Sequence, residues 1–396
     1  MSLGKALIPL QCKAMNYAWG KVGKNSLVYQ YIEHSKKGTL DVNKPYAEFW
    51  MGDHPSAPSL TADGGKRLSE VIKVGEKKLP YLFKILSIQK PLSLQCHPNL
   101  SQAVMLHQKD PEHYPDPNHK PECGFFLTKG TLVYGIREYN EIIEFLKHIP
   151  EFKNLISNQN YEKFVSIPNE ETFKNVLENL LTCDKKALAE NLNNFKTNYQ
   201  NGKYSSAIDQ KTRHGVDLII ENFPDDVGIF IPFILNVIVS EPGKALFIPP
   251  GTLHAYLEGD LIEIMALSDN VVRAAMTPKF VDVETLFKVM NFKPLGCHYL
   301  EPKKEIDENN HRTFLHYYQS GFDSFNLEHG HIESHKSINI KQKKNASIIA
   351  ILKGNIVKLN GEQYHEGNTV LIQGNTDVKC ENCGNDEADV YICSSL

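Results

Sequence analysis

Two histidines and a glutamate in this chain have the residue types and spacing of a metal site. His97 follows Gln95 by two positions, so on a strand the two side chains point to the same face. Glu122 follows a proline-rich loop, and His254 follows the Pro-Pro-Gly turn at 249–251. Imidazole and carboxylate groups suit a divalent transition metal. An amide is an unusual metal ligand, so the residues alone leave Gln95 open, and both histidines could instead be core histidines.

Changes of pattern along the chain indicate the elements that must position these residues. Up to about Arg137, short apolar runs separated by Gly, Pro, Asn and Asp predict strands. From about Glu138 to Pro224 apolar residues recur at helical spacing, and strands resume near Val227. A stretch rich in Lys, Glu and Asn at 303–311 predicts a connector before a last strand-like block. The expected domains are a split catalytic β domain (1–137 and 226–300), a helical insertion domain (138–225) and a C-terminal β domain (301–396).

The histidine at 254 ends a motif with a structural meaning. Residues 243–254 read G-x5-P-x-G-x2-H, which resembles the second signature of the cupin superfamily. That signature describes an apolar strand, a Pro-Gly turn and a histidine at the mouth of a small barrel with room for one small ligand. Residues 349–378 repeat the glycine-punctuated rhythm without metal-binding residues, which suggests a second, non-catalytic cupin. The expected fold class is mainly β with an inserted α-helical domain and two cupin-like jelly-roll β-barrels.

Five motifs together resemble the type I mannose-6-phosphate isomerase family along essentially the whole chain. They are NYAWG at 16–20, YAEFWMGDHPS at 46–56, LSLQCHPN at 92–99, NHKPE at 118–122, and the run from Pro249 through DNVVR at 269–273 to TPKF at 277–280. Their order is that of the family, which chance does not explain. The family is a zinc enzyme with cupin domains and an inserted helical domain, in agreement with the three-part pattern.

The resemblance implies a metal, a substrate and a reaction. It implies one Zn²⁺ per chain and the interconversion of D-mannose 6-phosphate and D-fructose 6-phosphate, which feeds GDP-mannose synthesis. The family's zinc ligands fall on Gln95, His97, Glu122 and His254, so Gln95 becomes an expected ligand. The family's essential arginine falls on Arg273, and its cavity-lining residues fall on Ser93, Lys84, Lys120, Tyr256 and Glu263.

Isomerisation through a cis-enediol requires a base, an electrophile and a cation for the remote phosphate. Glu263 is the expected base, because it is a lone carboxylate in the apolar run 261–267, where desolvation raises a carboxyl pKa. Arg273 would supply a cation near the enediolate or the phosphate, and Lys279 would contact the phosphate. Lys120 or a zinc-bound water could replace Glu263 as base, and Glu263 could instead simply pair with a neighbouring cation.

Two other functional classes could use this chain. A cupin oxygenase would bind iron through His97, Glu122 and His254, but it would leave Arg273 and Lys279 without a purpose. A non-enzymatic storage or sugar-sensing protein with two cupin domains should lack the metal residues, whereas this chain retains the whole set. The isomerase is therefore the preferred interpretation.

Three other features have simpler interpretations. Cys380 and Cys383 have no second cysteine pair, and His329 and His331 have no Pro-x-Gly-x2-His partner downstream, so we expect no second metal at either place. Lys84 stands alone in an apolar run and could be an edge-strand gatekeeper rather than a site residue.

Composition excludes several classes of protein. The 396 residues, with 41% hydrophobic and 23% charged, are typical of a globular protein. The net charge of −4 lacks the basic excess of a nucleic-acid binder. No stretch approaches the roughly 20 apolar residues of a membrane helix, and neither a signal peptide nor a disulfide framework is recognisable. We therefore expect a cytoplasmic monomer that binds a phosphosugar and neither nucleic acid nor a membrane.

Overall fold

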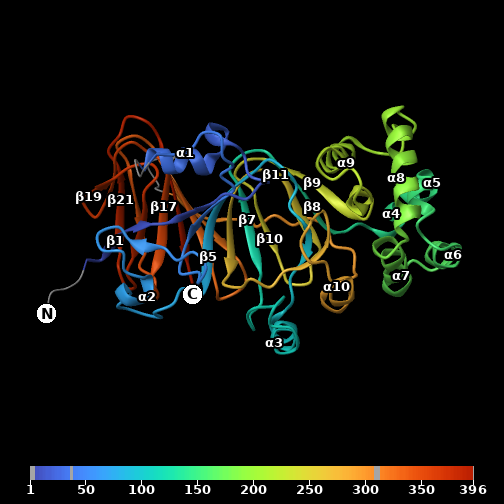
Figure 1. Cartoon of the computed structure of the whole chain (residues 1–396). Coiled ribbons are helices and arrows are strands. Elements are labelled where there is room, and N and C mark those ends of the chain that lie inside the picture. The colour runs from blue at the N-terminus through green and yellow to red at the C-terminus, as the bar shows by residue number, and fades with distance from the viewer. Residues whose placement is uncertain (1–4, 36–38, 307–312, 396) are drawn as a thin grey trace.

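The computed structural model describes residues 5–35, 39–306 and 313–395. They form an elongated molecule with the C-terminal strands at one end and a block of helices at the other (Figure 1). The helical block runs from α4 (Tyr139–His148) to α9 (Gln210–Asn222), and strands precede and follow it. The predictions of a mainly β chain and of a helical block within it are thereby confirmed.

The strands pair antiparallel in three sheets. One sheet has the order β13 (Lys303–Ile306), β14 (Phe314–Gln319), β15 (Asn326–Ile332), β22 (Ala388–Ser394), β17 (Ser347–Lys353), β20 (Thr369–Ile372), β1 (Leu7–Gln11), β4 (Leu60–Thr61). The central sheet has the path β10 (Ala245–Ile248), β7 (Glu122–Phe126), β11 (His254–Ala266), β5 (Tyr81–Ile88), β3 (Glu48–Met51), β2 (Lys13–Met15), and its remaining strands are β6 (Leu94–Cys96), β12 (Val272–Ala275), β8 (Gly130–Ile136), β9 (Leu235–Ser240). The smallest has the order β16 (Ser337–Ile340), β21 (Val378–Asn382), β18 (Val357–Leu359), β19 (Glu362–Tyr364). Within the described ranges none of these sheets closes into a barrel, so the two jelly-roll barrels stay a prediction.

The long strand β11 joins the parts of the central sheet that carry the candidate metal residues. Its first half pairs with β6 and β8, and its second half pairs with β5 and β7. The halves meet at Gly259, which has a φ of 119° and where a Cβ would lie 2.8 Å from the Cα of Gly130. Only glycine tolerates both this backbone angle and this close approach. The backbone conformation at Gly259 therefore lets one continuous strand pair with two sets of neighbours.

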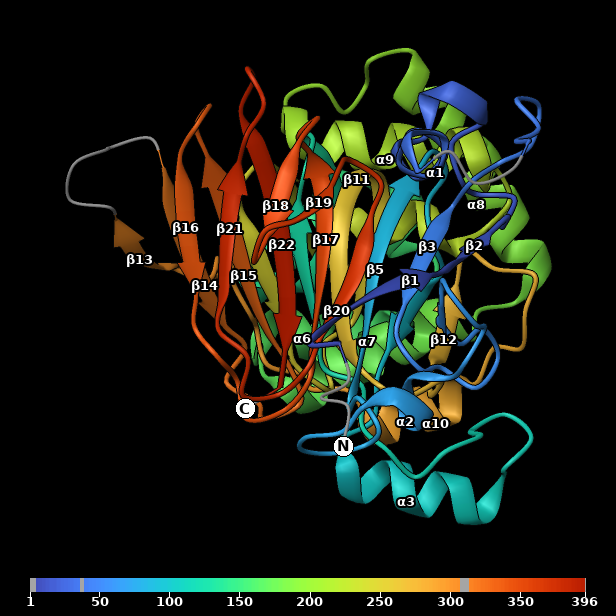
Figure 2. The ribbon, with the colours of Figure 1, turned by 90° about the vertical axis from the view of Figure 1, so that its left-hand side faces the viewer.

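The first strand of the chain belongs to the sheet of the C-terminal strands (Figure 2). β1 pairs with β20 in the register Leu7 to Ile372, whereas β2 pairs with β3 in the central sheet. The helix α1 (Leu27–His34) reinforces the junction, because the Tyr31 hydroxyl donates a hydrogen bond to the Asn368 carbonyl at 2.8 Å. One apolar core extends from Phe49 and Ile85 to Ile348 and Leu371 and holds the two large sheets together.

The helical block buries the residues that the helical spacing predicts. Phe173, Val176, Leu177 and Leu180 of α7 (Glu170–Leu181) are all fully buried. Side-chain caps also begin the helices α6 (Asn158–Ser166), α8 (Lys185–Gln200) and α9. The other helices are α2 (Leu68–Val71), α3 (Leu100–Lys109), α5 (Pro150–Lys153), α10 (Val283–Val289) and the 3₁₀ helices η1 (Gly23–Asn25) and η2 (Val227–Phe233). None of the described helices is both long enough and apolar enough to cross a membrane.

Two histidines of β15 share one carboxylate of β22. His329 Nε2 and His331 Nδ1 each lie 3.0 Å from Asp389 Oδ1. The hydrogen bond with Asp389 raises the pKa of His331. Burial raises the pKa of Asp389, but the hydrogen bonds from both histidines outweigh that effect and lower it. The pair of histidines therefore stabilises the sheet when the carboxylate is ionised and an imidazole is protonated.

We expect Asp389→Asn to lower thermal stability most between about pH 4 and about pH 6.5, the ordinary pKa values of Asp and His. The lowered pKa of Asp389 gives stability that is lost as the pH falls, and the raised pKa of His331 gives stability that is lost as the pH rises through it. Thermal unfolding at about pH 5.5 and about pH 9 measures the difference. Asp386→Asn, at an exposed carboxylate nearby, is the control, and an equal loss of stability at both pH values would contradict the prediction.

Candidate active site

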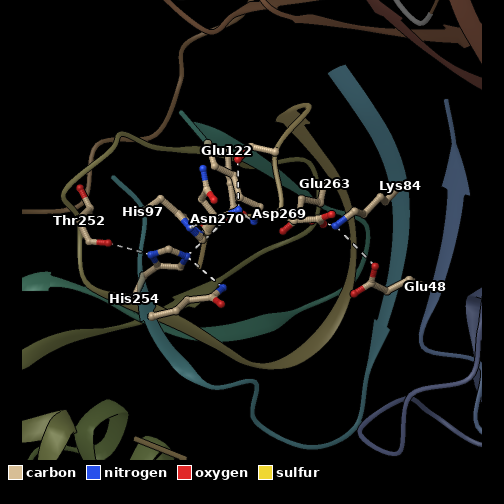
Figure 3. A network of polar contacts seen from close by, with 12 residues as sticks. Glu48, Lys84, His97, Glu122, Thr252, His254, Glu263, Asp269 and Asn270 are labelled. Atoms are coloured by element: carbon tan, nitrogen blue, oxygen red, sulfur yellow. Dashed lines mark hydrogen bonds and ion pairs between the residues drawn. The ribbon is translucent and has the colours of Figure 1, made fainter. Parts of the chain in front are cut away.

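Three strand ends bring His97, Glu122 and His254 together (Figure 3). His97 directly follows β6, Glu122 begins β7 and His254 begins β11. His97 Nε2 lies 3.2 Å from Glu122 Oε1, and His254 Nε2 lies 3.3 Å from Glu122 Oε2. All three side chains are buried, and one ligand atom from each lies within 4.8 Å of the others. The structure thus brings together three of the predicted metal ligands, which are distant in sequence.

The hydrogen bonds around the cluster leave lone pairs pointing inward. His97 Nδ1 donates to the Asn270 carbonyl, and His254 Nδ1 donates to the Thr252 carbonyl, each at 2.9 Å. Because a carbonyl only accepts, Nδ1 carries the proton, and in a neutral ring Nε2 is left with its lone pair. Such backbone partners commonly fix the orientation of metal-binding histidines.

Two buried atoms of the cluster make no hydrogen bond within the described residues, namely His97 Nε2 and Glu122 Oε2. Burial and the nearby Lys120 lower the pKa of His97 to about 4, so its ring is neutral at neutral pH. Burial raises the pKa of Glu122, but Lys120 and His97 outweigh it and hold the pKa well below its usual range. Neutral imidazoles and an ionised carboxylate are the protonation states that metal ligands require. The three residues therefore fit a divalent metal ion.

Gln95 lies next to His254 at the edge of the cluster. It pairs directly with His254 in the register of β6 and β11, and its Nε2 lies 3.5 Å from His254 Nε2. Cys96, the residue between Gln95 and His97, is buried away in the apolar core that includes the helical block, as strand alternation predicts.

A second charged cluster lies on the adjacent strands β3, β5 and β11. Lys84 Nζ lies 2.8 Å from Glu263 Oε2 and 3.5 Å from Glu48 Oε2, and all three side chains are buried. Burial raises the pKa of Glu263, with Lys84 acting against it. Burial would lower the pKa of Lys84, but Glu263 and Glu48 raise it. Glu263 is therefore both desolvated, as predicted, and paired with a cation, which was the open alternative.

A cavity of about 590 Å³ connects the two clusters. Most of the predicted site residues line it, and these are Lys84, Ser93, Gln95, Lys120, Glu122, Glu263, Arg273 and Lys279. Lys120 forms an ion pair with Glu122, and Arg273 pairs with Gln95 in the register of β12 and β6. Tyr256 is fully buried against Gly124 instead. Lysine and arginine side chains thus gather around one cavity of a chain that is negatively charged overall.

The sequence reasoning missed several residues of the cavity wall. Glu48 lines the cavity and accepts a hydrogen bond from Trp50 Nε1 at 2.5 Å. Asp269 also lines it, 3.1 Å from the buried His54, whose hydrogen bond lowers the pKa of Asp269. Glu48 carried the same signal as Glu263, a single charge within an apolar strand. Tyr17 lines the rim beside Lys279, whose ammonium lies 5.9 Å from the Tyr17 ring.

Comparisons with known proteins agree with this geometry. The family model of the phosphomannose isomerase type I catalytic domain matches residues 7–139. A probable mannose-6-phosphate isomerase from Dictyostelium discoideum is 34% identical over 411 residues, covering 94% of this chain and 89% of that protein. The mannose-6-phosphate isomerase of Rattus norvegicus is 39% identical over 311 residues, covering 73% of this chain and 74% of that protein.

A solved structure extends the similarity to the fold. The zinc-bound crystal structure of a mannose 6-phosphate isomerase matches with a TM-score of 0.82 and 26% identity, covering 99% of this chain and 100% of that chain. The chain therefore belongs to the type I mannose-6-phosphate isomerase family and is an enzyme with that family's isomerase activity.

Proposed function

We propose that the enzyme interconverts D-mannose 6-phosphate and D-fructose 6-phosphate through a cis-enediol at the cavity between the two charged clusters, with one Zn²⁺ per chain. The observation that carries the proposal is the convergence of His97, Glu122 and His254 on one buried point beside a cavity lined by several lysines and an arginine. A structural relative that binds zinc supports the choice of metal.

His97, Glu122 and His254 would hold the zinc ion, and Gln95 would join them through its amide oxygen. The amide orientation is interchangeable, so rotation of that group would present oxygen in place of nitrogen. Bound zinc supplies Lewis acidity that polarises a substrate carbonyl and holds the neighbouring oxygen. Lys120, which pairs with Glu122, lies at the boundary between the ligands and the cavity.

Glu263 is the proposed base for the proton that moves between C1 and C2. Its burial raises the pKa, which makes the carboxylate a stronger base than an exposed one. Lys84 holds the Glu263 carboxylate toward the cavity through the contact at 2.8 Å. Lys120 is the alternative base, and it forms an ion pair with Glu122.

The remaining polar residues of the cavity are assigned to the substrate. Arg273 would stabilise negative charge on the enediolate or the phosphate, and Lys279 would bind the phosphate. Ser93 would donate to or accept from a sugar hydroxyl, and the family resemblance assigns Tyr256 to the substrate as well. An iron oxygenase could use the same three metal ligands, but these cations favour an anionic substrate and hence the isomerase.

From the sequence and the family resemblance we also propose that the chain divides into catalytic (1–137 and 226–300), helical (138–225) and C-terminal (301–396) domains, and that the two β domains have a cupin-like jelly-roll fold. We propose further that the reaction precedes GDP-mannose synthesis and that the enzyme is a cytoplasmic monomer.

We expect Glu263→Gln to lower kcat about 100-fold or more, because the loss of a general base usually has an effect of this size. A coupled isomerase assay on mannose 6-phosphate measures it, with metal content determined on the same sample. Glu258→Gln is the matched control, since Glu258 lies on the same strand but pairs with His214. A kcat within about tenfold of the parent enzyme would exclude Glu263 as the base.

Removal of the metal residues should abolish both metal binding and activity. We expect Glu122→Gln and His254→Ala to lose bound zinc, because each takes a ligand from a site with few ligands. Metal analysis and the coupled assay measure the two effects. His107→Ala, at a histidine that bonds the Tyr114 carbonyl, should retain zinc. Stoichiometric iron in the parent enzyme, with no isomerisation, would overturn the proposal.

The pH profile should respond to Lys84. The base must be deprotonated, and Lys84 lowers the pKa that burial raises on Glu263, so Lys84→Met should move the acid limb of kcat/KM to higher pH. Lys21→Met is the control, because Lys21 forms an ion pair with Asp260 of the same strand at 2.6 Å. An acid limb that stays in place, or that moves equally in both variants, would argue against Glu263 as the titrating base.

A further inference from the structure

One wall of the cavity begins at a residue with an unfavourable backbone conformation. Met276 directly follows β12 and has a φ of 55°, in the left-handed region that residues with a side chain rarely adopt. Its side chain is buried, and the chain from Met276 to Lys279 lines the cavity. Such a conformation persists only where the surroundings hold it, and it is most often kept at functional sites.

A carboxylate that follows the helical block in sequence holds Met276. The Met276 N–H donates to Asp226 Oδ2 at 3.1 Å, and the Gly228 N–H donates to Asp226 Oδ1 at 2.7 Å. Asp226 thus caps η2 with one oxygen and holds the cavity wall with the other. Each oxygen of the Asp226 carboxylate therefore accepts a hydrogen bond from a different backbone N–H group.

The packing at Gly228 shows that this contact is close. A Cβ at Gly228 would lie 2.4 Å from Met276 Cγ, so only a glycine leaves room for the Met276 side chain. The segment before Asp226 also reaches the cavity, because Asn222 and Phe223 line it. The end of the helical block is therefore part of the wall, and Asp226, which follows it in sequence, links it to the segment that begins at Met276.

We propose that Asp226 is a positioning residue of the isomerase, which keeps Met276 in its left-handed conformation and so holds the segment 277–279 against the cavity. The inference rests on the proposed function at one point, the assignment of the substrate phosphate to Lys279. Without the carboxylate, the Met276 N–H loses its acceptor and the backbone relaxes from the left-handed region. The backbone that carries Lys279 then loses its fixed place, which weakens substrate binding more than the chemical step.

The kinetic test uses two substitutions of Asp226 and a matched control. Asp226→Asn retains one acceptor oxygen for the Gly228 cap but presents an N–H₂ group to the Met276 N–H. Asp226→Ala removes both acceptors. We expect the KM for mannose 6-phosphate and the Ki of inorganic phosphate to rise about 10- to 100-fold in both variants, with kcat changed much less. Asp184→Ala removes another capping carboxylate of the helical block, which accepts from Lys186 and Ala187, and should change neither constant.

A second measurement reports on the wall without using activity. Lys279 is exposed and is followed by Phe280, so trypsin can cut between them. We expect both Asp226 variants to be cut at this bond faster than the parent enzyme and Asp184→Ala. The Asn variant keeps the test decisive if the Ala variant fails to fold.

The outcomes separate the inference from the proposed function. Unchanged KM and unchanged trypsin cleavage in Asp226→Asn, or equal changes in Asp184→Ala, would overturn the positioning role. Faster cleavage with an unchanged KM would overturn the link between this wall and substrate binding. A parent enzyme that isomerises mannose 6-phosphate but is not inhibited by inorganic phosphate would overturn the phosphate site, while the cleavage rates would still decide whether Asp226 holds the wall.

Discussion

The burial of charged side chains within sheet strands is the constraint on which the rest of the site depends. An isolated charge in an apolar interior is strongly unfavourable, and it is retained only when it is paired or binds a metal. Glu122 meets this condition through His97, His254 and Lys120. Lys84 and Glu263 meet it through each other, with Glu48 as a second carboxylate. The two compensated clusters face one cavity, so the charges that the fold must neutralise are also those that can act on a substrate.

The strand β11 contributes a residue to each of these two clusters. It carries His254 at its start and Glu263 near its end, and the backbone conformation at Gly259 allows the two halves to pair with different strands. The distance between the metal residues and the proposed base is therefore set by backbone hydrogen bonds rather than by flexible loops. Sites built on strands in this way are held more precisely than sites built on loops.

Segments outside the central sheet complete the site and stabilise it. The end of the helical block supplies Asn222 and Phe223 to the cavity wall, and Asp226, which follows the block, holds that wall at Met276. At the other end of the molecule, β1 pairs with a strand of the C-terminal block, so the beginning and the end of the chain share one sheet and one apolar core. The helical block and the first strand thus contribute to the site and to its stability through tertiary contacts that their own sequences do not predict.

The sequence by itself determined the donors and their local geometry. Residue type selected His97, Glu122 and His254, strand alternation excluded Cys96, and apolar spacing located the helical block. A lone carboxylate in an apolar run indicated Glu263, and the same reasoning applied to Glu48 would have found it. These features could be predicted because each depends on neighbours within a few residues.

Only the tertiary structure decided which of these residues meet, and with what partners. The ion pair between Lys84 and Glu263 depends on the register of β5 and β11, strands separated in sequence by the helical block. The contact between Asp226 and Met276 depends on how the start of η2 lies against the residue that follows β12. The pairing of β1 with β20 depends on the two ends of the chain folding together. Long-range registers of this kind follow from the packing of the whole core, and no local pattern of side chains encodes them.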